Sequence, residues 1–203
     1  MVSRQQAIQW AQDKEVDIIS MSFAIPEYYN KSDEYARKLT KQVKQADDKK
    51  IIQMCSHHDE GWNVDKYWPA QCGQPKIIVA CNEYGVFPDR EPGEYHYQIH
   101  GMDIFTGSVT YLECKDTMSG SSVATAIASG LASLVLSCER LQSPNHQTDI
   151  DRRQQLVNDA FEKMSDPRGG PFTSNKRYLQ LGKFSNFAGI RFSWFDGLMA
   201  RKL

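Results

Sequence analysis

The chain has 203 residues, which is enough for one domain with a sizeable hydrophobic core. Its 24 basic and 25 acidic residues give a formal net charge of −1, which excludes the strongly basic surfaces typical of nucleic-acid-binding proteins and of proteins that bind anionic membranes. The five cysteines are an odd number without framework or zinc spacing, so they argue against a disulfide scaffold and indicate reduced thiols.

The sequence shows no targeting or membrane segment. No apolar run approaches the roughly 18 residues of a transmembrane helix, so we expect no membrane span. The first six residues, Met-Val-Ser-Arg-Gln-Gln, lack the apolar core of a signal peptide. Together with the reduced thiols, this predicts an intracellular protein, although a chain that had lost an N-terminal signal would show the same pattern.

In the first half of the chain, helices alternate with short apolar strands. Residues 3–13 and 33–48 carry apolar side chains at helical intervals and predict two amphipathic helices. Residues 16–23, 51–56 and 76–80 are almost continuously apolar, as buried parallel strands are. This order predicts an α/β fold, with a mainly parallel, doubly wound sheet and helices on both faces. We expect the three strands to share one sheet, with the first two as parallel neighbours.

The second half is less regular. Residues 63–74 and 85–98 are rich in turn-forming residues and are expected to form loops, whereas residues 95–105 are expected to hold a further strand or strand pair. Residues 149–164 predict a helix with one apolar face. Residues 178–203 form an aromatic and basic tail.

Residues 117–136 organise the rest of the chain. Small residues recur at close intervals, and the apolar residues between them surround the helix, which is typical of a buried helix. Gly120 interrupts the preceding segment, and Ser121 and Ser122 are suitable N-cap residues. A serine hydroxyl at the positive end of a buried helix can serve as a nucleophile or bind an anion. The plainer interpretation is a central packing helix with an ordinary cap.

The segment His57-His58-Asp59-Glu60 is a second candidate for chemistry, because its residue types can bind a metal ion. Adjacent residues on an extended chain point to opposite sides, however, so His57 and His58 are poor joint ligands. We therefore expect neither a metal nor a cofactor.

Several of these segments resemble the subtilisin-like serine peptidases. The run from Gly120 to Ala126 is similar to the motif that carries their nucleophile, which implies that Ser122 is the nucleophile. Residues 7–11 and 16–23 resemble the family's helix and the strand whose end contacts the substrate. The resemblance implies that Ser22 and Phe23 bind a peptide or protein substrate.

The same resemblance assigns a role to Asp59. Gly61 aligns with a glycine of the family, so Asp59 takes the position of an asparagine whose side-chain amide donates a hydrogen bond to the oxyanion of the tetrahedral intermediate. An ionised carboxylate can only accept hydrogen bonds. Asp59 is therefore a catalytic candidate that departs from the family pattern.

The family's catalytic aspartate and histidine would lie before residue 1, and neither of their motifs occurs in this sequence. The resemblance covers residues 5–138. It implies an incomplete subtilisin-like domain at residues 1–140, followed by a C-terminal helix and aromatic tail at 141–203. We expect a serine endopeptidase by family, inactive as this isolated chain, for which the missing N-terminal half of the domain is a candidate partner.

Two alternatives remain open. The chain could be a non-catalytic interaction module, a pseudoenzyme that kept a peptidase fold and lost the catalytic residues. It could also be an unrelated α/β domain that binds an anion at Ser121 and Ser122.

Overall fold

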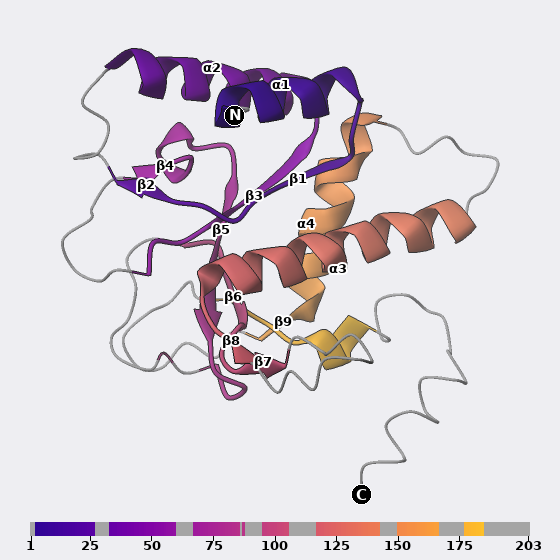
Figure 1. Cartoon of the computed structure of the whole chain (residues 1–203). Helices are drawn as coiled ribbons and strands as arrows, with labels where there is room; N and C mark the ends of the chain where they lie inside the picture. Colours follow the sequence, from indigo (N-terminus) through magenta and orange to yellow (C-terminus); the bar gives the residue numbers. More distant parts are fainter. Residues whose placement is uncertain are drawn as a thin grey trace, which may run out of the picture.

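A computed structural model describes residues 3–26, 33–59, 67–85, 87, 95–105, 117–142, 150–166 and 177–184. Its centre is a six-stranded sheet (Figure 1). In spatial order, the strands are β1 (Ile18–Met21), β3 (Ile52–Ser56), β5 (Lys76–Cys81), β6 (Tyr97–His100), β10 (Tyr178–Leu179) and β9 (Ser165–Asp166). This is the α/β fold with a mainly parallel sheet that the sequence predicts.

The strand pairing agrees with the sequence. β1 and β3 are parallel neighbours, with Ile18 opposite Ile52, and β5 continues the sheet parallel to β3. β6 and β10 extend it in the same direction, and β9 alone runs antiparallel, beside β10. The expectation that the three apolar runs share one sheet is therefore confirmed.

Helices cover both faces of the sheet (Figure 1). On one face lie α1 (Arg4–Asp13) and α2 (Asp33–Asp48), and on the other lie α3 (Ser121–Gln142) and α4 (Arg153–Met164). Each layer has its own buried core. The first packs Leu39 and Val43 of α2 against the sheet, and the second packs Ala128 of α3 and Phe161 of α4 against it. Burial of these apolar surfaces drives the folding of both layers.

α3 crosses the sheet at close range because small side chains face the strands. Ala124, Thr125, Ala128 and Ala132 are all fully buried. The hydroxyl of Thr125 donates to the Ser121 carbonyl oxygen at 2.7 Å, so the buried polar group is satisfied within the helix. Residues 121–141 are long and apolar enough to cross a bilayer, by length and composition alone, which corrects the expectation that no apolar run approaches that length. In this fold, the helix packs along the sheet as a core helix.

The remaining elements are short. β2 (Ile25–Pro26) and β4 (Tyr67–Trp68) form an antiparallel pair, as do β7 (Ile104–Phe105) and β8 (Thr117–Met118). Three 3-10 turns complete the described chain: η2 (Ala70–Cys72), η3 (Ile150–Arg152) and η4 (Leu181–Lys183).

Two sequence expectations need correction. Residues 63–74 contain β4 and η2, and the expected tail begins with β10 and η4. Strands of two residues carry no periodicity, and they form here through pairing with distant partners. Residues 143–149, 167–176 and 185–203 lie outside the described residues, so most of the aromatic tail is not placed.

Candidate functional site

Asp59 lies three residues beyond β3 and reaches the beginning of α3. Its Oδ2 accepts a hydrogen bond from the Ser121 backbone N–H at 2.8 Å, and its Oδ1 accepts one from the Ser121 hydroxyl at 2.5 Å. The first N–H groups of a helix have no partner within the helix, and the helix dipole makes this end positive. A carboxylate from the segment that follows β3 therefore caps α3, a contact between residues that are 62 positions apart.

Ser121 is the junction of this arrangement. Its side chain is fully buried, and its Oγ accepts a hydrogen bond from the Ala80 backbone N–H in β5 at 3.1 Å while it donates to Asp59. One hydroxyl thus connects β5, the segment after β3 and the beginning of α3. The sequence suggests Ser121 as a local N-cap, but the structure makes it the first residue of the helix and gives the capping role to Asp59.

Gly120 fits a position that excludes a side chain. Its φ is +135°, a conformation that L-residues rarely adopt. A Cβ at this residue would lie 3.1 Å from Asp59 Oδ2 and 3.7 Å from Ser122 Oγ. The Asp59 carboxylate and the exposed Ser122 hydroxyl are therefore neighbours on the same side of Gly120.

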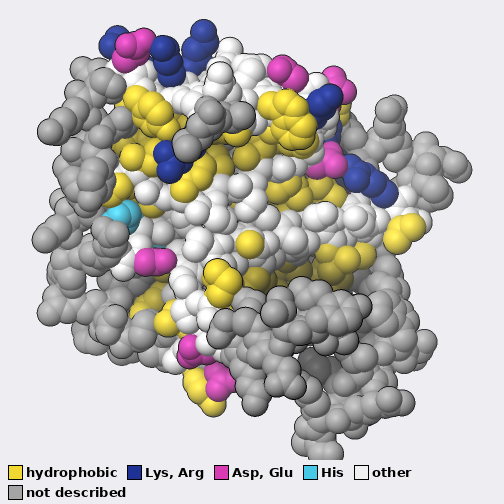
Figure 2. All heavy atoms as spheres, in the orientation of Figure 1, with side chains coloured by type: hydrophobic (Ala, Val, Ile, Leu, Met, Phe, Trp, Pro, Cys, Tyr) yellow, Lys and Arg dark blue, Asp and Glu magenta, His cyan; other side chains and the backbone are white. Residues whose placement is uncertain are grey.

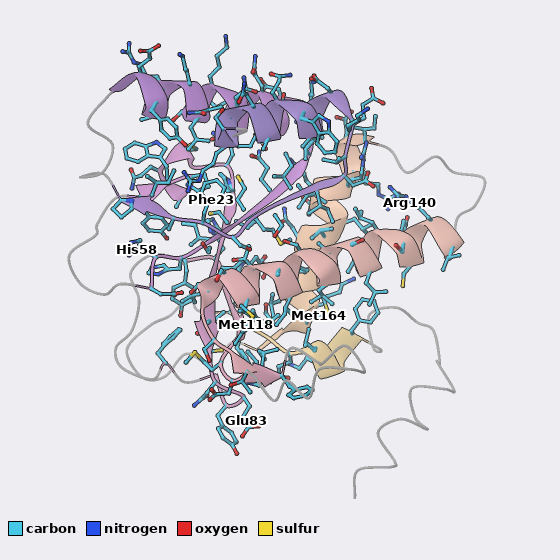
Figure 3. The ribbon with its side chains drawn as sticks, viewed as in Figure 1. Phe23, His58, Glu83, Met118, Arg140 and Met164 are labelled. Atoms are coloured by element: carbon cyan, nitrogen blue, oxygen red, sulfur yellow. The ribbon has the colours of Figure 1, made fainter. Side chains whose placement is uncertain are left out.

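The segment that follows β1 also meets α3. Ser22 Oγ donates a hydrogen bond to the Ser122 carbonyl oxygen at 3.0 Å, so the end of β1 is attached to the first turn of the helix. Phe23 follows directly, half-buried, and Figure 3 shows its side chain and that of His58 on the side of the molecule where α3 begins. The structure thus brings Ser22, Asp59 and Ser122 together at the carboxyl ends of parallel strands. Their chemical roles remain predictions.

The two histidines pack around one tyrosine. His57 Nδ1 donates to the His58 carbonyl oxygen at 2.7 Å, and the imidazole centroids of His57 and His58 lie 5.5 Å and 6.1 Å from the Tyr67 ring centroid. Burial lowers the pKa of His57, so its imidazole is uncharged at neutral pH. Within the described ranges, no group of three or more histidine, cysteine, aspartate or glutamate side chains is arranged to hold a metal ion.

Sequence reasoning missed two residues next to this site. Ala80 contributes only a backbone N–H, which no residue type can signal. Arg4, at the beginning of α1, lies with its guanidinium carbon 5.0 Å from the centroid of the Phe23 ring. This pair joins a helix and a strand end that the sequence predicts separately, and no local pattern indicates that they meet.

Replacing Ser121 with alanine is expected to lower the free energy of unfolding by about 1–3 kcal/mol, because the buried Ala80 N–H then loses its acceptor and Asp59 loses a donor. Chemical denaturation of the purified chain measures the difference. Ser137→Ala is the matched control, since the Ser137 hydroxyl is exposed and donates a hydrogen bond to the Ser133 carbonyl oxygen of the same helix. It should change the stability by less than about 0.5 kcal/mol. Equal effects of the two substitutions would show that Ser121 is not a junction.

The sequence profile of the subtilase family matches residues 2–187, so it includes α4, β9 and β10. The chain belongs to the subtilase family. No curated protein matches the sequence.

Several solved structures have the same fold. The prenylagaramide maturation protease PagA superposes with a TM-score of 0.67 at 20% identity, over 90% of this chain and 66% of PagA. The patellamide maturation protease PatA gives 0.68 at 19% identity, over 91% of this chain and 68% of PatA. The self-cleaved protease domain of PatA gives 0.65 at 19% identity, over 91% and 67%. The chain therefore spans about two thirds of the length of these structures.

Proposed function

We propose that this chain is the nucleophile-bearing part of a serine endopeptidase, with Ser122 as the nucleophile and Asp59 as the residue on the oxyanion side. Membership of the subtilase family supports the reaction class. The observation that carries the residue assignment is the Asp59 carboxylate on the first turn of α3, beside the exposed Ser122 hydroxyl. Ser22 and Phe23 would bind the substrate chain next to it.

The chemistry follows from the position of Ser122. Its Oγ would attack the carbonyl carbon of a peptide bond, pass its proton to a base, and leave negative charge on the carbonyl oxygen. The helix beginning at Ser121 favours such charge through its dipole.

The proposed reaction also needs a base that takes the proton of Ser122 Oγ. An unassisted hydroxyl is a weak nucleophile at neutral pH, and no histidine among the described residues hydrogen-bonds to Ser122 Oγ. We infer that the base comes from a polypeptide segment that carries an Asp and a His motif and packs against this chain. The 203-residue chain alone should be unreactive.

A fluorophosphonate serine probe tests the proposal. The 203-residue chain should not react, whereas a longer chain that includes an Asp and a His motif before residue 1 should be labelled. Ser122→Ala should abolish that labelling, and Ser133→Ala, which changes another exposed serine of the same helix, should leave it intact. Labelling of the 203-residue chain at Ser122 would mean that one of its own histidines serves as the base.

Asp59 should limit the reaction rate. An ionised carboxylate beside the developing oxyanion repels it, whereas an asparagine would donate a hydrogen bond and still cap α3. In the longer chain, we expect Asp59→Asn to accelerate labelling by about a hundredfold, the scale associated with one oxyanion donor. Labelling time courses at fixed probe concentration measure the change. An unchanged or slower rate in a normally folded variant would remove Asp59 from the oxyanion side.

A non-catalytic interaction module is the second candidate function. It is favoured by one observation, namely that Asp59 presents only acceptors where a donor is needed and is already engaged by Ser121. The absence of labelling in both the longer chain and its Asp59→Asn variant, with both folded, would select this alternative.

A further inference from the structure

Arg4 and Phe23 form a cation–π pair next to the candidate site. The Arg4 guanidinium carbon lies 5.0 Å from the centroid of the Phe23 ring, within the range of such contacts. Phe23 directly follows Ser22, whose hydroxyl bonds to the Ser122 carbonyl oxygen. The pair therefore places a positive charge beside the two residues proposed to bind the substrate.

The stability of α1 does not explain this arginine. Arg4 is the first residue of the helix, where the dipole disfavours a cation, and the first turn holds no acidic residue. Ser3 and Gln6 already form a capping box, with hydrogen bonds of 2.8 Å and 3.3 Å between backbone and side chain. Among the described residues, no carboxylate pairs with Arg4, whose side chain is exposed.

The Arg4 side chain is exposed, so its guanidinium can bind an anion. The N–H donors of a guanidinium lie in one plane in a fixed fork that matches the two oxygens of a carboxylate. On the face seen in Figure 2, charged side chains gather mainly over α1 and α2, and fewer lie across the centre. A peptide that crosses from Ser122 toward α1 would leave the Asp59 carboxylate and approach the Arg4 guanidinium.

We propose that Arg4 is a specificity determinant that selects peptides with an acidic side chain, Asp or Glu, where the peptide passes Phe23. This inference rests on the proposed function, because it assumes that the substrate lies along Ser22 and Phe23. The carboxylate of the substrate Asp or Glu binds the N–H groups of Arg4, while the aliphatic part of that Asp or Glu side chain packs on the Phe23 ring.

Peptide binding to the 203-residue chain tests this without requiring catalysis. The probes are fluorescein-labelled alanine-rich hexapeptides that carry a single Glu, or a single Lys, at each successive position. Fluorescence anisotropy at low salt should find one or two adjacent positions at which the Glu peptide binds about three- to fivefold more tightly than the Lys peptide, the scale of one exposed ion pair. The preference should shrink as the salt concentration rises.

Three variants make the test specific. Arg4→Glu should reverse the preference, and Arg4→Lys should keep its sign but weaken it, because lysine cannot bind a carboxylate with two parallel N–H groups. Arg152→Glu is the control. Arg152 is also exposed, but it adjoins Arg153, which pairs with Asp17 just before β1, at the opposite end of that strand from Phe23. It should leave the preference unchanged.

The outcomes separate this inference from the proposed function. Equal binding of Glu and Lys peptides at every position, no peptide binding, or a preference that survives Arg4→Glu would overturn the role of Arg4. Labelling of Ser122 in the longer chain together with any of these results would remove this inference alone. A preference that depends on Arg4, in a protein that never labels, would remove the peptidase chemistry alone.

Discussion

Phe161→Ala should lower the free energy of unfolding by about 3–5 kcal/mol, the usual cost of removing a large aromatic side chain from a packed core. Phe161 is 1% exposed, and its ring packs edge-on against Tyr97 with centroids 5.3 Å apart and an interplanar angle of 86°. The substitution removes this contact and leaves a cavity between α4 and β6. Urea denaturation followed by circular dichroism measures the loss.

The matched control is Phe105→Ala. Phe105 is 61% exposed in β7, so its removal should change the stability by less than about 0.5 kcal/mol. The experiment also reports whether α4 shares its core with the sheet. We expect one cooperative transition for both variants. Two separate unfolding transitions would contradict a shared core if Phe161→Ala shifted the midpoint of only the one that belongs to the later part of the chain.

Gly101→Ala should destabilise the chain by about 1–3 kcal/mol through overpacking. A Cβ at Gly101 would lie 2.9 Å from the Ala124 Cβ, 3.1 Å from the Ala80 Cβ and 3.2 Å from the Ala124 backbone nitrogen. Neither neighbour has a flexible side chain that could move away, so the beginning of α3 would have to shift from β5. Denaturation midpoints of the variant and the unchanged chain give the difference.

Gly130→Ala is the control with the opposite sign. Gly130 lies in α3, and a Cβ there would meet nothing within 4 Å. Alanine is preferred over glycine inside a helix, so this substitution should stabilise the chain by about 0.5–1 kcal/mol. If both variants moved the stability in the same direction, close approach at Gly101 would not be the cause.

Sequence patterns predict the main strands and helices because these elements depend on features that repeat locally. The apolar runs at 16–23 and 51–56 indicate buried parallel strands, and the small residues of 117–136 indicate a helix that approaches a sheet closely. The strands of two residues have no such signal in the sequence. β10 forms from Tyr178 and Leu179 because β6 offers an open edge, and two residues cannot display a period.

The candidate site shows the same contrast between local sequence patterns and contacts of distant segments. The sequence identifies Ser122 through its motif. It identifies Asp59 through its position two residues before Gly61. It does not indicate that the Asp59 carboxylate caps α3 or that Ser121 connects it to Ala80, because these contacts join separate elements across 62 and 41 positions. Only the folded chain brings these groups together.

The location of a covalent phosphonate adduct tests the nucleophile assignment most directly. The longer chain, with an Asp and a His motif before residue 1, would be treated with the fluorophosphonate probe, digested, and sequenced by tandem mass spectrometry with fragmentation between Ser121 and Ser122. We expect the adduct on Ser122, because its side chain is exposed whereas that of Ser121 is fully buried and bonded to Asp59. An adduct on Ser121, or on a residue outside α3, would contradict the assignment of Ser122 as the nucleophile.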